Sequence, residues 1–311
     1  MHQKKNRIHS SLYPWVVFLL SASFLFYKYL IEVSPSVLAN ELMSELQILG
    51  TQLGNLTSFY FYAYLIMQIP VGLLLDRFGP RVLTSCAIIL CASGAFLLAD
   101  AQSFYVACLG RFISGTGAAF AAISCFKLIT IWFKANRFAF MAGLMMTAGM
   151  LGAVGGQAPL ASSISAFGWR PTLNMIAIVG IVFGIVFFMV VRNKSNNGQV
   201  THIKTKSFTE SIRAIAKKRQ NWLLSIFSGL AFAPVSVLGG LWGVPFVSQA
   251  YHMSKTAAAS NISLIFIGFA VGAPMLGILS DQVGRRKPLV YIGTIAAFFL
   301  ICIALFCTSI P

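Results

Sequence analysis

The sequence predicts an all-α membrane protein with about nine transmembrane helices, six in a first bundle and three in an incomplete second one. Three observations lead to this fold class. Of the 311 residues, 58% are hydrophobic and 10% are charged, whereas a soluble domain has about 25% charged residues. The apolar residues form runs of about 20, the length that crosses a bilayer as a helix. Lysine and arginine gather in alternate segments between these runs.

The apolar runs define the expected helices in chain order. They lie near residues 14–34, 52–75, 81–99, 103–131, 137–159, 171–191, 222–248, 257–279 and 289–309. With a cytoplasmic N-terminus, eighteen of the 23 Lys and Arg residues fall in cytoplasmic segments, whereas Arg170 and Lys255 fall in loops on the other side. By the positive-inside rule, we expect a multi-pass protein of the cell (inner) membrane with its N-terminus in the cytoplasm.

A polar stretch divides the chain into two parts. We expect an N-terminal six-helix bundle over residues 1–192, a cytoplasmic basic linker over 193–221 and a partial C-terminal bundle of three helices over 222–311. The linker is expected to lie on the anionic inner leaflet. Because most of the net charge of +16 lies in cytoplasmic segments, the expected partner is the lipid bilayer and not nucleic acid.

The composition of the polar positions argues against an enzyme or a metalloprotein. The six cysteines fall inside apolar runs, without a Cys-x-x-Cys pair or a nearby histidine cluster, and they are interpreted as core residues. The chain contains no phosphate-binding glycine loop, no spacing typical of a catalytic triad and no His-Glu-x-x-His. We therefore expect no catalytic residue, no cofactor and no bound metal.

A charged loop motif occurs twice, at residues 72–81 and, 205 positions later, at 277–286. The shared spacing Gly-x-x-x-Asp-x-x-Gly-x-Arg indicates two related halves arranged in parallel. The residues expected to act in these gating loops are Gly72, Asp76, Arg77, Gly79, Arg81, Arg137, Gly277, Asp281, Gly284, Arg285 and Arg286. Gly72 is expected to allow a close helix contact, and Asp76 is expected among nearby arginines. The alternative is that both loops are only topology signals.

These two loops resemble the signature of the major facilitator superfamily of secondary transporters. The fourth span supports the resemblance, because Arg111, Gly115 and Gly117 in "GRFISGTGAAF" are similar to the family's helix-4 motif. In the fifth span, glycines 143, 152 and 156 match an exchanger motif, but Gln157 stands in place of its proline. The stretches "VSPSV", "GLWGVPF" and "FGWRPT" resemble a bacterial branch near amino-acid and peptide carriers.

The resemblance implies two helical bundles that move solutes by alternating access. It also implies that the first gating loop closes against helix 11 and the second against helix 5. Members usually have twelve helices, whereas this sequence ends after the ninth expected span. We therefore expect a C-terminally truncated member, without helices 10 to 12 and without the partner of the first loop. A transport-incompetent remnant is the alternative, and a membrane enzyme or receptor on the same scaffold is a third hypothesis.

Ionisable side chains at membrane depth are candidate sites, because an unpaired charge there costs several kcal/mol. Lys28 and Glu32 are four residues apart in the first span and can pair on one helix face. As a site, Lys28 would bind a substrate anion and Glu32 would carry a proton. The alternative is that both reach the outer surface, which the lysine stem permits. Arg111 lies two turns inside its span, and we expect it to be paired or to face a cavity.

Aromatic and amide side chains complete the candidate site. Tyr60, Tyr64 and Gln68 recur every four residues on one face of the second span, where they would line a cavity or, for the tyrosines, belong to the interfacial aromatic belt. Gln157 is a further candidate, as is Trp242, which lies where glycines and a proline interrupt the seventh span. A simple kink is the alternative for that interruption.

Together these residues predict a secondary active transporter of a small organic solute. The buried cations favour an amino acid, a peptide or an organic anion as the substrate. Coupling to protons remains open, so protons are a second candidate partner.

Overall fold

The computed structural model describes residues 12–193, 217–283 and 286–306, and these residues are helical apart from short turns. The helices are α1 (Tyr13–Glu45), α2 (Gly50–Phe78), α3 (Pro80–Ala99), α4 (Phe104–Ala118), α5 (Phe120–Trp132), the 3₁₀ turn η1 (Ala135–Arg137), α6 (Phe138–Gly155), α7 (Ala158–Phe167), α8 (Trp169–Val190), α10 (Arg219–Pro234), the π-helix η2 (Val235–Trp242), α11 (Gly243–Ala250), α12 (Lys255–Val283) and α13 (Arg286–Phe306). The prediction of an all-α fold is confirmed.

Seven helical segments in the described part of the chain are long and apolar enough to cross a membrane. Two further helices coincide with the fifth and ninth expected spans. The fifth corresponds to the 18-residue α6, which ends at Gly155, and is interrupted before α7 begins at Ala158. The ninth corresponds to the 21-residue α13, which is apolar over Pro288–Ile303 among the residues whose side chains are described. The predicted count of about nine spans is therefore roughly matched.

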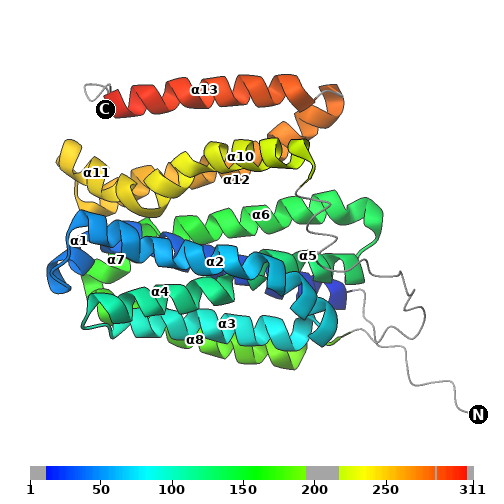
Figure 1. Cartoon of the computed structure of the whole chain (residues 1–311), viewed down its shortest axis with the longest axis horizontal. Helices are drawn as coiled ribbons and strands as arrows, with labels where there is room; N and C mark the ends of the chain where they lie inside the picture. Colours follow the sequence, from blue (N-terminus) through cyan, green and yellow to red (C-terminus); the bar gives the residue numbers. More distant parts are fainter. Residues whose placement is uncertain (1–11, 194–216, 284–285, 307–311) are drawn as a thin grey trace, which may run out of the picture.

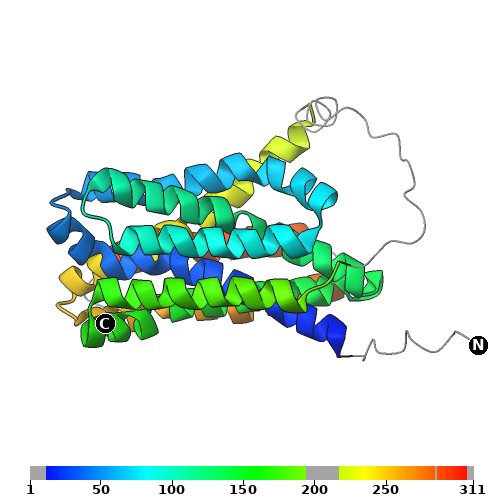
Figure 2. The same cartoon turned by 90° about the horizontal axis from the view of Figure 1, so that it is seen from below.

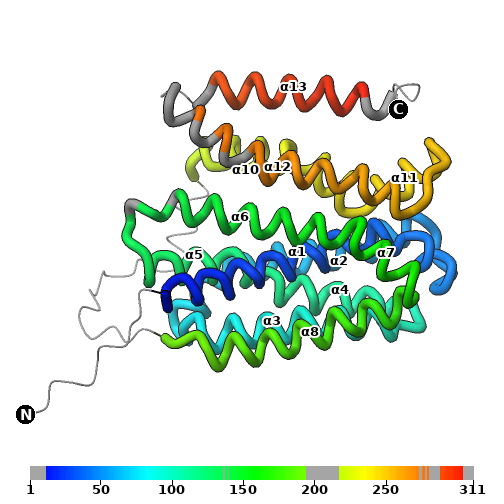
Figure 3. Tube along the Cα trace, turned by 180° about the vertical axis from the view of Figure 1, so that it is seen from behind, coloured from blue at the N-terminus to red at the C-terminus, as the bar shows by residue number. Residues whose placement is uncertain are grey.

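The helices run side by side in successive layers (Figures 1 and 3). Helices α3 and α8 lie on one side of the molecule, α1, α2 and α6 lie in the middle, and α10 to α12 follow, with α13 outermost. The turn between α1 and α2 marks one end of the bundle, which we call the Glu45 end. The opposite end carries the turn between α2 and α3, and we call it the Asp76 end; the first helix starts there (Figure 2).

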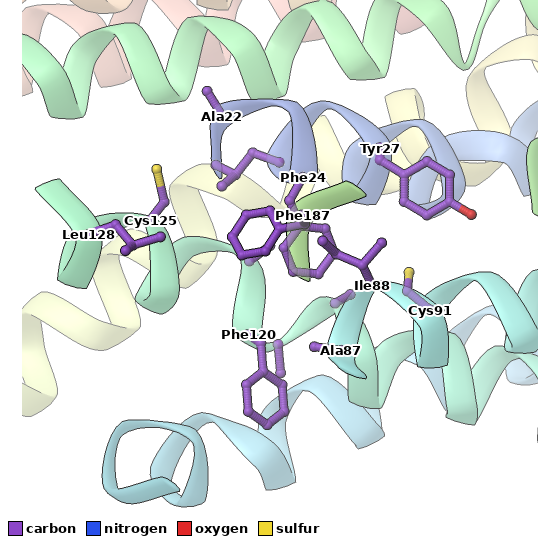
Figure 4. Packing of buried hydrophobic residues seen from close by; sticks show 14 of the residues in the cluster. Ala22, Phe24, Tyr27, Ala87, Ile88, Cys91, Phe120, Cys125, Leu128 and Phe187 are labelled. Atoms are coloured by element: carbon purple, nitrogen blue, oxygen red, sulfur yellow. The ribbon is translucent and has the colours of Figure 1, made fainter. Parts of the chain in front are cut away.

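The main apolar core lies within the first group of helices. Phe24 of α1, Ile88 of α3 and Phe187 of α8 are fully buried against one another (Figure 4). A second core cluster joins the far part of α1 to η2, α11 and α12. Helix α1 therefore belongs to both groups of helices, and it is the element from which the candidate site is built.

Helix α1 is longer than expected. The sequence predicts that it ends near residue 34, but it continues to Glu45 with Pro35 inside it. The expectation was wrong because residues after Pro35 are more polar, although every apolar position among Val37, Leu38 and Leu42 is buried in the second core cluster. With 33 residues and a rise of 1.5 Å per residue, α1 is about 50 Å long.

Glycines set how closely several helices approach. A Cβ at Gly115 would overlap the backbone of Tyr60, and one at Gly152 would overlap the backbone of Phe26. Small residues permit such backbone contacts between transmembrane helices. The same role expected for Gly72 is not seen, since a Cβ there would meet nothing within 4 Å in the described part of the chain. The expectation was wrong because Gly72 lies on the side of α2 that faces away from its described neighbours, whereas Val71 and Leu75 in the same stretch are buried.

We expect Gly152→Val to lower the thermal stability of the detergent-solubilised protein. The added methyl groups would push α6 away from α1, and overpacking of this kind costs about 1–3 kcal/mol. Gly143→Val is the matched control on the same helix, because nothing lies within 4 Å of a Cβ at that position. Melting followed by tryptophan fluorescence should show a clear decrease for the first variant and a small one for the second. Equal decreases would contradict the close contact.

Candidate functional site

A buried ion pair lies in the middle of α1. Lys28 is bonded to Glu32, and their side chains are 7% and 8% exposed. Lys28 is the sixteenth of the 33 residues of α1, so it lies near the centre of the helix and far from either end. The predicted pairing is confirmed, whereas the alternative of an outer pair that reaches the surface is wrong, because α1 extends well beyond the expected end.

Arg111 of α4 and Ser34 together compensate for a missing helix bond in α1, since the Ser34 hydroxyl also donates to the carbonyl of Ile31, at 2.9 Å. Pro35 has no N–H, so the carbonyl of Ile31, four residues earlier, lacks its usual helical donor. The Nη1 atom of Arg111 donates to this carbonyl at 3.0 Å, and Nη2 donates to the carbonyl of Glu32 at 3.4 Å. Arg111 is fully buried. Of the two expected alternatives for Arg111, the structure shows pairing, and its partners are backbone carbonyls.

Tyrosine rings surround the two cations. The ring of Tyr60 lies 4.6 Å from the Arg111 guanidinium carbon, and Tyr60 is fully buried. The Lys28 ammonium lies 3.7 Å from the Tyr29 ring centroid and 5.0 Å from that of Tyr64. Cations over aromatic faces gain electrostatic stabilisation in a desolvated setting. Tyr60 therefore belongs to the interior and not to an interfacial belt.

The face of α2 that carries these tyrosines leads toward the Asp76 end. Tyr60 and Tyr64 stack with ring centroids 6.4 Å apart. Tyr60 is fully buried, whereas Tyr64 and Gln68, one and two turns further along, are half-buried. The predicted stripe is therefore half-buried at Tyr64 and Gln68, whereas Val71 and Leu75, further along the same face, are again fully buried.

The charges of this cluster do not cancel. Lys28 and Arg111 are cations, Glu32 is the one described anion bonded to either, and all three are buried. A positive charge left inside a bundle favours the binding of an anion, since charge in a medium of low dielectric is costly unless paired. The described residues contain no group of His, Cys, Asp and Glu side chains suited to a metal ion. The arrangement is suited to binding an anion reversibly.

The first gating loop has different partners from those expected. Asp76 is bonded to Lys127 of α5, not to an arginine. The Nε of Arg81 donates to the carbonyl of Phe188 at 2.8 Å, which fixes the loop to the end of α8. Gly79 has φ +79°, a conformation that favours glycine. The described ion pair of Asp76 is thus made by Lys127, which reaches it from a helix that is distant in sequence and which was not among the arginines expected nearby.

The other expected gating residues lie at the surface or outside the described part of the chain. Arg77 lies with its guanidinium carbon 5.4 Å from the Phe78 ring, and Arg137 is exposed in η1, without an ion pair to any described residue. In the second loop, Gly284 and Arg285 lie outside the described residues. The side chains of the remaining members also lie outside the described part, namely Gly277, Asp281 and Arg286.

Gln157 and Trp242 lie toward the Glu45 end, away from the charged cluster. Gln157 is fully buried between α6 and α7, and its Nε2 donates to the carbonyl of Gly239 at 2.7 Å. Trp242 is 37% exposed and packs near the start of α2, where a Cβ at Gly50 would meet its ring at 3.2 Å. The predicted interruption of the seventh span is present as the π-helix η2.

Two ion pairs at the Glu45 end were missed from the sequence. Glu41 is bonded to Lys255, and Glu45 lies 2.9 Å from Arg170. The available signal was that Arg170 and Lys255 are the two basic residues placed in outer loops. Because α1 was expected to end at residue 34, the two glutamates were not recognised as residues of a helix that could meet these cations.

Comparisons with known proteins agree with the fold. Residues 16–311 match the family described as Major Facilitator Superfamily. The chain is 26% identical to a probable L-galactonate transporter of Escherichia coli (strain K12), over 82% of this chain and 58% of that protein. It is 25% identical to a hexuronate transporter of Bacillus subtilis (strain 168), over 88% and 65%. The chain thus spans less than two thirds of these relatives.

A solved structure resembles this one in fold. It is that of a bacterial homologue of the human lysosomal transporter Spinster, in an inward-facing and unoccupied conformation. The TM-score is 0.73 at 21% sequence identity, and the match covers 88% of this chain and 64% of the solved one.

We expect Arg111→Leu to destabilise the protein, because the carbonyl of Ile31 would lose its charged donor and keep only the Ser34 hydroxyl. A hydrogen bond to a charged group contributes about 1.5–3 kcal/mol. Adding Pro35→Ala should recover part of the loss, since alanine restores the helical N–H that bonds to this carbonyl. Melting temperatures of the four proteins of this double-mutant cycle test the coupling. Strictly additive effects would contradict the proposed role of Arg111.

Proposed function

Because this chain belongs to the major facilitator superfamily, we propose that it is a secondary active transporter of a small organic anion, working by alternating access. In this function, it is a multi-pass protein of the cell (inner) membrane with its N-terminus and the linker of residues 193–221 in the cytoplasm. The six helical spans before the linker and the spans after it form the two parts that move relative to each other.

The observation that carries the proposal is the buried excess of positive charge in the middle of α1. Arg111 is bonded to two backbone carbonyls, so its position is fixed by α1. Lys28 is held by one carboxylate and by two aromatic rings. A substrate carboxylate that replaces Glu32 at the ammonium would exchange one charged partner for another. Lys28 is therefore the proposed anion-binding residue.

The relatives favour a hydroxylated organic acid as the substrate. Two of them are named as transporters of L-galactonate and of hexuronate, and both compounds carry a carboxylate and several hydroxyl groups. The half-buried Tyr64 and Gln68 would supply hydroxyl and amide partners for such groups. An amino acid or a peptide, the narrower expectation from the sequence, would also present a carboxylate, and the uptake test includes both.

The route to the site is proposed to open at the Asp76 end. None of the described residues of α10, which starts at that end, is buried, whereas several contacts join the two groups of helices at the Glu45 end. With the N-terminus in the cytoplasm, this arrangement corresponds to access from the inside. The ion pair of Asp76 and Lys127 would break or form again as that end changes between its open and closed states.

Glu32 is the proposed proton carrier. Its partner Lys28 would take up the substrate carboxylate, and a buried glutamate without a cationic partner is favoured in the protonated form. Proton binding to Glu32 would therefore accompany substrate binding to Lys28, which makes symport with protons the expected mode.

We expect the full chain in proteoliposomes to take up radiolabelled glucuronate or galactonate, and Lys28→Met to reduce this uptake. Loss of a charged hydrogen bond costs about 1.5–3 kcal/mol, so the initial rate at low substrate should decrease about 10-fold to 100-fold. Parallel assays contain tartrate, single amino acids and dipeptides.

Lys134→Met is the matched control, because Lys134 is exposed at the Asp76 end and the change removes the same charge. Its uptake should equal that of the unmodified chain. Uptake of peptides but not of sugar acids would replace the proposed substrate class, and no protein-dependent flux for any solute would overturn the transport function.

We expect an inwardly directed proton gradient to accelerate uptake by the unmodified chain and to have no effect on Glu32→Gln. Glutamine keeps the size of the side chain but cannot carry a proton between the two states. Uptake by the variant without a gradient checks that the binding site is intact. Equal acceleration of both proteins would exclude Glu32 as the carrier, and acceleration of neither would exclude proton coupling.

A further inference from the structure

Gln157 is buried between the two groups of helices and not beside the charged cluster. It separates α6 from α7, in the interruption of the fifth span. Neighbouring Gly156 fits tightly against α1, because a Cβ there would lie 2.8 Å from the carbonyl oxygen of Leu30. The backbone at Gln157 is thus held by the first group, while its side chain extends to the second.

The partner of Gln157 is an irregular segment. Eight residues of the seventh span, Val235–Trp242, form a π-helix directly after Pro234. Such segments are rare in α-helical proteins and occur frequently at functional sites. The carbonyl of Gly239, in the middle of η2, accepts the hydrogen bond from the Gln157 amide at 2.7 Å. Gly239 itself packs against the ring of Phe266 on α12.

Other contacts between the two groups lie at the same end of the molecule. Lys255 at the start of α12 is bonded to Glu41 near the end of α1. The ring of Trp242 packs near Gly50 at the start of α2. Toward the Asp76 end, by contrast, the described residues of α10 include none that is buried. The Glu45 end is therefore closed by specific contacts between the groups, and Gln157 supplies a fully buried hydrogen bond among them.

We propose that Gln157 is a positioning residue that holds the Glu45 end closed by fixing the π-helix η2 to the first group of helices. The inference rests on the proposed function in one respect, namely that the two groups move relative to each other. When the Glu45 end opens, the bond between Gln157 and Gly239 breaks and α11 moves away from α1 with η2. The amide thus stabilises one of the two states and takes no part in binding the solute.

Spin-label distances in the absence of any solute test the proposal. One label pair, at Gln102 and Ser254, reports on the Glu45 end, and a second pair, at Lys134 and Gln220, reports on the Asp76 end. All four positions are exposed. Cys86, Cys302 and Cys307 are replaced by serine, whereas the three cysteines that the structure shows to be buried, Cys91, Cys108 and Cys125, remain. The protein is measured as the full chain in nanodiscs.

We expect Gln157→Met to lengthen the first distance and to shorten the second. Methionine has a similar size but no donor, and the loss of one hydrogen bond should shift the ratio of the two states about fivefold. Opening one end closes the other in alternating access, so the two changes have opposite signs. If the substitution only loosened the packing of the helices, both distances would become longer or more broadly distributed.

Gln157→Ala is the second variant, for the case that the first does not fold. Alanine has no donor for the Gly239 carbonyl and cannot overfill the site, so the same opposite changes are expected. Gln249→Met, at an exposed position of α11, is the matched control and should leave both distances unchanged. No change in the Gln157 variants, or changes of the same sign at both ends, would overturn the proposal. The distances are measured without solute, so this result does not depend on the outcome of the uptake assay.

Discussion

The bond between Arg111 and the carbonyl of Ile31 is the interaction on which the rest of the structure depends. Pro35 removes a backbone donor from the middle of a membrane-spanning helix, and the carbonyl of Ile31 accepts instead from the Ser34 hydroxyl and from an arginine. This arginine comes from α4 and brings a full charge with it. That charge is covered by the ring of Tyr60 on α2. One missing N–H thereby determines how three helices lie relative to one another.

The position of this bond places two different tasks on one helix. Lys28, on the near side of Pro35, lies within the first group of helices, and Glu41, on the far side, is bonded to the second group. The two residues are 13 positions apart, so they are separated by about 20 Å along α1. A change in the charge at Lys28 and a change in the contacts at Glu41 therefore act on the same rigid element. Such an element gives a physical route by which solute binding and closure influence each other.

The features that could be predicted from the sequence are those that depend on residues close together along the chain. The apolar runs gave the fold class, and the spacing of four residues gave the pair of Lys28 and Glu32. Features that depend on distant segments were not predictable in the same way. The partner of Asp76 is 51 positions away on another helix, and the length of α1 depends on apolar surface supplied by η2 and α12. The openness around Gly72 likewise depends on where neighbouring helices lie.

The distance in sequence between Ile31 and Arg111 also has a consequence for biosynthesis. These residues are 80 positions apart, and ribosomes add about 5–20 residues per second, so α1 waits about 4–16 s for its arginine. During this interval the Ile31 carbonyl has only the Ser34 hydroxyl as its side-chain donor, and the nascent helix carries an ion pair at membrane depth. It is then best accommodated beside the protein-conducting channel, where water and channel side chains are available. The first helix of this protein is therefore expected to leave the insertion machinery late, together with α4, and not on its own.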